Sequence, residues 1–334
     1  MENPLAGQSG EFFQVPYAEC MEFGFLFCLP VKVNMTCTIC GNQLIVRYPQ
    51  VMDPQTGDKF SIYTCVNCGL GHTKPEPDDM SRYYGRHYYG GRHGFTDTFC
   101  VKRRLRLVSS MFDSCRCGRL LDIGCGEGVF LSLARKSGWE VFGTERNPEL
   151  ARKAGLTVEE TIEDVHSFAP FDCITLWHSL EHLSDPGFTL KRLSALLKPR
   201  GSIVIAVPDF GGLQAGLFRD QWLHLDIPRH LYHFNDRALT LLLDSAGLSP
   251  KQRWHQEFEY DLLGWSQSAL NKMMHVPNAF FDILTGRTEK MNKRLKYACI
   301  GTGILLSALA VPAVFFSTFI RKGGTLIIAA SRTL

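Results

Sequence analysis

The chain of 334 residues is long enough for one large α/β domain and a small accessory module, each with its own core. Its 36 lysines and arginines against 33 aspartates and glutamates leave a formal net charge of +3, too small and dispersed to indicate a nucleic-acid-binding surface by itself. Four of the 12 cysteines form two Cys-x-x-Cys pairs, the spacing of a metal site, which favours a reducing cytoplasm over a disulfide-bonded secreted protein.

The first segment, residues 1–34, contains an apolar run that acidic residues precede. A secretory signal begins with basic residues, so we do not expect such a signal here. Met35 stands directly before the first cysteine pair. We therefore expect residues 1–34 to be a poorly ordered extension, or to lie upstream of the true start of translation.

The two cysteine pairs predict a zinc ribbon over residues 35–75. A glycine follows each pair, and two short strand patterns separated by turn residues lie between them. Four thiolates suit tetrahedral Zn²⁺ and leave no position open for a catalytic water, so the zinc is expected to be structural. The predicted zinc ligands are Cys37, Cys40, Cys65 and Cys68.

The next segment, residues 76–117, is predicted to be a linker followed by a helix. Tyrosines, arginines and histidines crowd into residues 82–93. Such a stretch could stack on nucleobases or sugars. We favour the alternative that its tyrosines pack on the following domain and cover the mouth of a ligand site.

A glycine-rich turn follows the apolar strand pattern of residues 119–123 and leads into a helical pattern. Glycines let the chain reverse tightly and let a ligand approach the backbone at a helix N-terminus. A second predicted strand, residues 140–144, ends at Glu145, where a carboxylate can accept both hydroxyls of a ribose. A dinucleotide-binding enzyme has a similar pattern, so these features alone leave the ligand open.

The run Asp-x-Gly-x-Gly-x-Gly at residues 122–128 resembles motif I of the class I methyltransferases that depend on S-adenosylmethionine (SAM). The resemblance extends from about Leu120 to Gly247, and its one departure, Arg200 in the family's Leu-Lys-Pro-Gly-Gly turn, falls in a surface turn. It implies an α/β fold with a Rossmann-like, seven-stranded sheet.

The same resemblance implies the residues that hold SAM. It places Thr161 and Ile162 near the adenine and Trp177 at the methionine end, and a core tryptophan is the alternative for Trp177. The full set of implied SAM-binding residues is Asp122, Gly124, Gly126, Gly128, Glu145, Thr161, Ile162 and Trp177.

Two histidine-rich segments, residues 177–182 and 222–234, together with the ribbon resemble zinc-ribbon methyltransferases of the group that includes quinone-biosynthesis O-methyltransferases and enzymes acting on surface saccharides. We therefore predict O-methylation of a hydrophobic or lipid-linked small molecule, such as a quinone-like or polyprenyl- or saccharide-bearing intermediate. A hydroxyl acceptor must lose its proton, for which histidine is the obvious general base. We rank His182 first and His230 second, and a structural histidine is the alternative for each.

His178, Glu181 and His182 have a spacing that would point all three the same way on one helical turn. The quinone O-methyltransferases carry an acid, an acid and a histidine at the matching places and bind a divalent metal there. The departure at His178 argues against a second divalent metal in this chain, which stays an alternative.

Residues 298–320 form an apolar run between basic clusters, long enough to span a bilayer. Pro312 interrupts it, and residues 324–331 after it resemble the family's last strand, which pairs inside the catalytic sheet. We therefore predict a re-entrant or surface-lying segment, with two short helices bent at Pro312, that attaches monotopically to the cytoplasmic face of a membrane. The alternative is a helical hairpin buried as a lid or as the interface of a homo-oligomer.

These patterns divide the chain into six segments. They also leave two alternative functions open. The segments are an extension (1–34), the ribbon (35–75), a linker and helix (76–117), a SAM-binding core (118–260), a helical insertion (261–322) and the last strand (323–334). The ribbon and linker keep RNA methylation as an alternative, although nucleic acid is not the expected partner. A SAM-binding regulatory or assembly protein without catalysis is the other.

Overall fold

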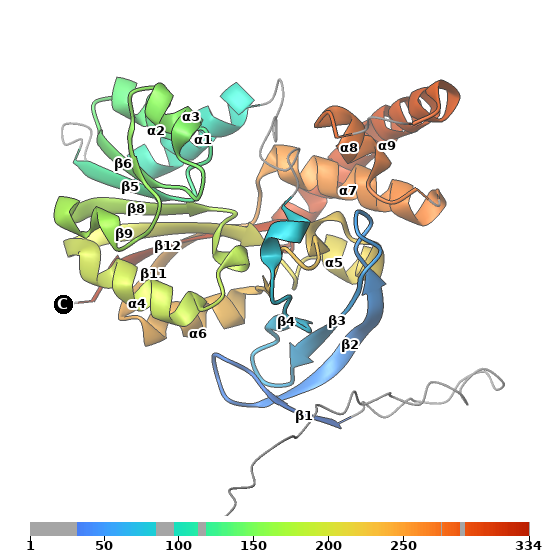
Figure 1. Cartoon of the computed structure of the whole chain (residues 1–334), viewed down its shortest axis with the longest axis horizontal. Helices are drawn as coiled ribbons and strands as arrows, with labels where there is room; N and C mark the ends of the chain where they lie inside the picture. Colours follow the sequence, from blue (N-terminus) through green and yellow to red (C-terminus); the bar gives the residue numbers. More distant parts are fainter. Residues whose placement is uncertain (1–31, 85–96, 113–117, 275, 288–290, 334) are drawn as a thin grey trace, which may run out of the picture. The chain divides into compact units, whose positions relative to one another are not determined.

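The computed structural model describes residues 32–84, 97–112, 118–274, 276–287 and 291–333 (Figure 1). Prediction and structure agree on the fold class, because a seven-stranded sheet with helices on both faces forms the centre of the described chain. In spatial order its strands are β11 (Leu248–Trp254), β12 (Thr325–Arg332), β9 (Leu197–Pro208), β8 (Phe171–Trp177), β5 (Arg119–Ile123), β6 (Glu140–Thr144) and β7 (Thr157–Glu159).

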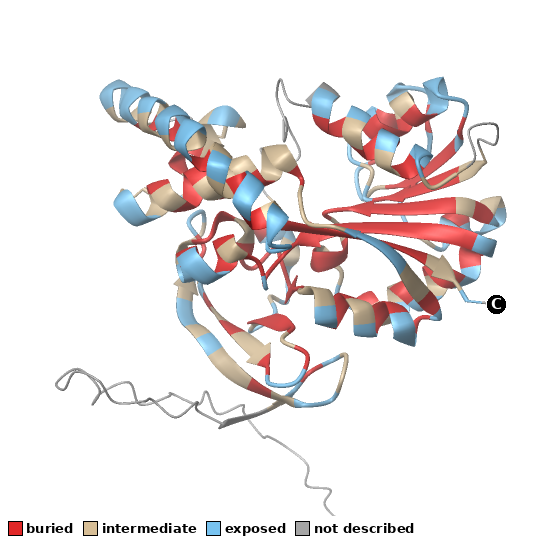
Figure 2. Ribbon diagram, turned by 180° about the vertical axis from the view of Figure 1, so that it is seen from behind, coloured by how far each residue is buried: buried red, intermediate tan, exposed pale blue. Residues whose placement is uncertain are grey.

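Five of these strands, from β9 to β7, run parallel, and β12 lies antiparallel between β9 and β11. The predicted last strand therefore pairs inside the catalytic sheet. Apolar residues occupy both faces of the central strands, which are buried along most of their length (Figure 2). Alternate residues serve the two faces, so that Leu121 joins one apolar cluster and its neighbour Leu120 the other.

Helices cover both faces of the sheet. One apolar cluster holds residues of α1, α2 and α3 against it, and the other holds residues of α4 and α6 (Figure 1). The bounds of these helices are Asp97–Ser109 (α1), Val129–Lys136 (α2), Glu149–Lys153 (α3), Pro186–Leu196 (α4) and Asp236–Ser245 (α6). The short helix α5 (Leu213–Phe218) follows β9.

The ribbon forms a second sheet, of five antiparallel strands. Its order is β1 (Lys32–Thr36), β2 (Gln43–Met52), β3 (Lys59–Cys65), β4 (Gly71–Lys74) and β10 (Tyr232–His233). The last of these strands comes from the catalytic region, more than 150 residues along the chain, and pairs with β4. Cys37, Leu44 and Leu70 also belong to the same apolar cluster as the residues beneath α4 and α6. The ribbon and the catalytic sheet thus share one core.

Three helices separate β11 from β12: α7 (Phe258–Met273), α8 (Ala279–Leu284) and α9 (Lys293–Phe319). The apolar run is a single helix with Pro312 inside it, so the prediction of two short helices bent at this proline is wrong. Pro312 lies on the exposed side of α9. The opposite side packs on α7 and α8. Phe280 of α8 lies against Gly303 before the proline, and Phe258 of α7 packs on Phe315 after it.

Candidate active site and metal centre

The glycine loop leaves the carboxyl end of β5 and enters α2. Gly124, Gly126 and Gly128 have φ angles of +72°, +56° and +78°, which L-residues with a side chain rarely adopt. A Cβ atom at Gly128 would lie 2.2 Å from Leu156 Cδ1, whereas one at Gly126 would meet no atom within 4 Å. Gly128 is therefore required by packing, while the backbone at Gly126 is open to a ligand.

Two acidic residues frame this loop, and only one of them faces outward. Asp122 is buried in β5 and accepts a hydrogen bond of 2.6 Å from the Thr175 hydroxyl, and burial raises its pKa to about 7. Glu145, directly after β6, is half-buried and accepts a hydrogen bond of 2.9 Å from the Gly126 amide. Asp122 thus fixes the base of the loop, and the Glu145 carboxylate lies where a ligand on the loop would meet it.

The other implied SAM-binding residues lie at the same edge of the sheet. Thr161 and Ile162 follow β7; Thr161 is exposed and donates a hydrogen bond to Asp164, and Ile162 is half-buried. Trp177, at the end of β8, is buried edge-on against Phe130 with ring centroids 5.7 Å apart. Phe130 lies in the first turn of α2, two residues beyond the glycine loop, so Trp177 borders the loop through Phe130 and also belongs to the core.

His178 is held in an ion pair that the sequence does not reveal. Its Nε2 lies 2.6 Å from Glu257 Oε2, and Glu257 also forms an ion pair of 2.7 Å with Arg104 of α1. Burial opposes protonation of His178, but its interactions with Glu181, whose Oε1 lies 3.7 Å from Nδ1, and with the hydrogen-bonded Glu257 raise its pKa above the ordinary value. A histidine that already bonds a buried carboxylate through Nε2 is a poor general base for a substrate, which leaves His182 and His230 as the better candidates.

His182 and His230 meet at the end of β8, in front of the buried Glu181. Their ring centroids are 4.7 Å apart, and the Nδ1 atoms lie 2.9 Å from the carbonyl oxygens of Arg229 and His224, respectively. A carbonyl only accepts, so each Nδ1 carries the proton and a neutral ring presents a lone pair on Nε2.

Glu181 is the charged centre of this group. It is 1% exposed, and neither carboxylate oxygen has a hydrogen-bond partner among the residues that the structure describes. Burial alone would raise the pKa of Glu181, but the adjacent His178, His182 and His230 lower it to about 2. The structure therefore places an ionised carboxylate 3.9 Å from His230 Nε2, where it would stabilise a positive charge on the imidazole.

Comparisons with known proteins identify the fold and its chemistry. A family model described as a methyltransferase domain matches residues 93–252, which include the glycine loop, Glu145 and both histidines. The chain carries a class I SAM-dependent methyltransferase domain. The matched segment contains the glycine loop with Gly126 and also Glu145, the residues predicted to bind SAM.

Curated relatives cover part of this methyltransferase. The ubiquinone biosynthesis O-methyltransferase of Xanthomonas axonopodis pv. citri is 26% identical over 163 residues, which is 43% of this chain and 68% of the relative. The enzyme of the same name from Bradyrhizobium diazoefficiens is 31% identical over 26% of this chain and 39% of the relative.

Solved structures give more distant matches. A SAM-dependent methyltransferase from Archaeoglobus fulgidus has a TM-score of 0.42 at 21% identity and covers 76% of this chain and 97% of its own. The 1,6-didemethyltoxoflavin-N1-methyltransferase of Burkholderia thailandensis has a TM-score of 0.45 at 17% identity and covers 86% and 100%.

The four predicted zinc ligands of the methyltransferase converge. Cys37 and Cys68 have Sγ atoms 3.6 Å apart, those of Cys40 and Cys65 are 3.4 Å apart, and all four lie within 4.8 Å of one another. Thiolates at the corners of a tetrahedron with Zn–S bonds of about 2.3 Å are roughly 3.8 Å apart. The cluster is therefore of the right size and donor type for Zn²⁺.

The predicted helical face of His178, Glu181 and His182 is only partly formed. His178 has a φ of +51°, outside any helix, and a short 3₁₀ turn begins at Leu180. Glu181 consequently lies between His178 on one side and His230 on the other. The three groups close enough to share an ion are Glu181, His182 and His230, and the last of these belongs to a different segment from the one predicted.

Proposed function

We propose that this methyltransferase transfers the SAM methyl group to a hydroxyl of a hydrophobic or lipid-linked small molecule. The observation that carries the proposal is the pair of imidazoles, His182 and His230, beside the buried Glu181 carboxylate at the end of β8. The O-methyltransferase names of the curated relatives support an oxygen acceptor. A quinone-like phenol or a polyprenyl- or saccharide-bearing intermediate has the required hydroxyl.

SAM would be held along the carboxyl edge of β5, β6 and β7. The open backbone at Gly126 accommodates its methionine part, and Glu145 exchanges its bond with the Gly126 amide for the ribose hydroxyls. Thr161 and Ile162 then flank the adenine, and Trp177 supports the methionine end through Phe130. When bound, SAM supplies a methyl group on a positively charged sulfur, which needs alignment more than activation.

His182 acts as the general base in this proposal. The acceptor oxygen forms a bond to the methyl carbon as the methyl–sulfur bond breaks, and the hydroxyl proton passes to His182 Nε2. The Glu181 carboxylate stabilises the imidazolium that results, because its own pKa of about 2 keeps it ionised at neutral pH. His230 is the second candidate for the same role, since its Nε2 faces the same carboxylate.

We also propose a structural zinc ion on Cys37, Cys40, Cys65 and Cys68. All four coordination positions are filled by sulfur, so the ion has no position for substrate. Its contribution is to hold together a small sheet that shares the core of the catalytic domain.

Finally, we propose that the enzyme attaches to the cytoplasmic face of a membrane through α9. The helix is long and apolar enough to cross a bilayer, and only 22% of its most apolar window is buried inside the protein. Its buried side carries small and medium-sized residues, namely Cys299, Gly303, Ala310, Val314 and Ser317, while larger apolar residues such as Leu309, Phe315 and Phe319 are exposed. That arrangement is the reverse of a soluble amphipathic helix and is typical of contact with lipid.

Calorimetry and labelled-SAM turnover test the methyl-transfer proposal. We expect SAM and S-adenosylhomocysteine to bind to the zinc-loaded chain, and labelled methyl to appear in a hydroxyl-bearing lipid or quinone fraction. Binding of a nicotinamide dinucleotide in place of SAM would overturn the cofactor assignment. RNase-sensitive transfer of label to RNA would overturn the acceptor class.

A further inference from the structure

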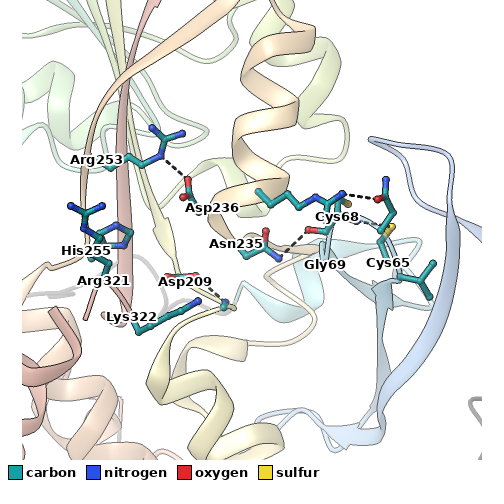
Figure 3. A pocket seen from close by; sticks show the side chains of 14 residues that line it. Cys65, Cys68, Gly69, Asp209, Asn235, Asp236, Arg253, His255, Arg321 and Lys322 are labelled. Atoms are coloured by element: carbon teal, nitrogen blue, oxygen red, sulfur yellow. Dashed lines mark hydrogen bonds and ion pairs between the residues drawn. The ribbon is translucent and has the colours of Figure 1, made fainter. Parts of the chain in front are cut away.

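A polar cavity of about 770 Å³ lies apart from the methyl-transfer site, between the second cysteine knuckle, the start of α6 and the end of α9 (Figure 3). None of its lining residues belongs to the glycine loop or to the histidine pair. Figure 3 shows Cys65 and Cys68 at one end of the cavity and Arg253, Arg321 and Lys322 at the other. The methyl-transfer proposal uses none of these three basic residues.

The basic end of the cavity is not neutralised by the protein. Asp236 forms an ion pair of 2.8 Å with Arg253, but no carboxylate lies within ion-pair distance of Arg321 or Lys322 in the described chain. Asp209 lies near Lys322, and although burial raises its pKa to about 6 it stays largely ionised at neutral pH and offsets part of this charge. The lining still holds four basic residues, Arg237, Arg253, Arg321 and Lys322, against the two acidic residues Asp209 and Asp236. A positive surplus contributed by β11 and the end of α9 therefore faces the same space.

A polar atom in the same wall also has no partner. His255, one residue beyond β11, lines the cavity, and its Nδ1 is buried without a hydrogen bond to any residue in the described part of the chain. A buried ring nitrogen without a partner costs free energy, which a ligand oxygen or hydroxyl would recover. Together with Arg321 and Lys322, this nitrogen points to an oxyanion with several acceptor atoms, such as a phosphate group.

The surroundings favour a phosphate that is attached to a hydrocarbon. A second depression, of about 460 Å³, is lined by glycines of the α5 region with Leu213 and Leu217, and it shares Gly211 and Lys322 with the polar cavity. Directly before Arg321, Phe319 is 86% exposed and Ile320 is 40% exposed. A basic pocket that continues into apolar surface matches the chemistry of an amphiphile rather than that of a free anion.

We propose that this cavity binds the headgroup phosphate of an anionic phospholipid while the outward face of α9 enters the bilayer interface. The proposal deepens the membrane attachment proposed above and does not depend on methyl transfer. Lys322 sits at the boundary of the polar cavity and the apolar depression, where a phosphate meets its glycerol and acyl chains. The two contacts together would fix the orientation of the enzyme on the membrane.

Vesicle flotation of the full-length, zinc-loaded protein tests this site, with phosphatidylcholine vesicles that contain or lack phosphatidylglycerol. We expect the double variant Arg321→Gln/Lys322→Gln to bind the phosphatidylglycerol vesicles about 10- to 30-fold more weakly and phosphatidylcholine vesicles unchanged. The matched control is Lys136→Gln/Lys153→Gln, which removes the same charge from exposed positions on α2 and α3 and should keep the preference.

Three results would overturn the proposal. One is an unchanged preference in the Arg321→Gln/Lys322→Gln variant, and another is an equal loss in the control, which would indicate diffuse charge. The third is soluble glycerol phosphate binding that this variant loses while vesicle binding stays intact, which would assign the cavity to a free phosphate ligand. SAM binding, measured by calorimetry on each variant, separates these failures from a failure of the methyltransferase assignment.

Discussion

Two clusters of side chains are close enough to hold a metal ion, and they differ in how the chain builds them. The cysteine cluster draws four identical ligands from two short turns, and its geometry is closed. The cluster at Glu181 takes His182 from the next position and His230 from 48 residues further on, and it lies at the carboxyl end of β8. The first arrangement suits structural support, and the second suits chemistry on a substrate.

The largest effect is expected from a substitution in the cysteine cluster. Cys37→Ser should abolish cooperative folding of the ribbon and lower the melting temperature of the whole domain, because zinc binding to such sites contributes about 10–16 kcal/mol and the two sheets share a core. Zinc content and thermal unfolding measure it. Cys299→Ala, at a buried cysteine outside the cluster, is the control and should retain zinc. Full zinc content in the Cys37→Ser protein would refute the site.

The proposed catalytic role of the cluster at Glu181 is tested by the substitution His182→Ala. We expect kcat to fall by about 10²- to 10⁴-fold while the Kd for SAM stays unchanged, because a general base acts on the acceptor and not on the cofactor. The same change at His230 identifies the better base. A variant in which SAM affinity falls as much as kcat would show that the histidine shapes the fold of the site instead.

The substitution Glu145→Ala tests SAM binding without changing a residue of either cluster. Loss of two charge-assisted hydrogen bonds to the ribose should weaken SAM binding roughly 10- to 100-fold, with the melting temperature of the SAM-free protein nearly unchanged. Calorimetry with SAM and with S-adenosylhomocysteine should show equal losses. Unaltered affinity would place the ribose elsewhere.

The ion pair of His178 and Glu257 makes a smaller contribution that depends on pH. The pKa of His178 is raised in the folded state, so its stabilising effect is complete below its ordinary pKa of 6.5 and is lost as pH rises through the folded value. The difference in unfolding free energy between wild type and His178→Gln should therefore shrink on going to alkaline pH. Denaturant curves at several pH values measure it, and a constant difference would contradict the assignment.

The substitution Phe319→Ser is expected to have the smallest effect on stability and on SAM binding. Because the side chain is 86% exposed, melting temperature and SAM affinity should hardly change, while binding to both phosphatidylcholine and phosphatidylglycerol vesicles should weaken. Leu150→Ser, at an apolar residue of α3 that is 54% exposed, is the matched control and should bind vesicles as the wild type does. Equal vesicle binding by the Phe319→Ser protein would argue for the alternative, an interface between copies of the chain.

Sequence alone determined the features that depend on neighbours along the chain. The spacing of Cys37 to Cys40 and of Cys65 to Cys68 predicts two turns, and the glycines of residues 124–128 predict a third, because glycine adopts positive φ at low cost and paired cysteines suit zinc. The strand and helix patterns around them were sufficient for the fold class. The domain boundaries and the individual site residues remain predictions.

Only the tertiary structure decided which distant groups meet. Glu257 has no motif around it, yet folding brings it to His178 and Arg104, and β10 joins the ribbon sheet from the far side of the catalytic region. The continuity of α9 through Pro312 likewise depends on packing against α7, which local sequence preferences do not contain. Contacts between distant segments are selected by the free energy of the whole core, so short sequence patterns cannot specify them.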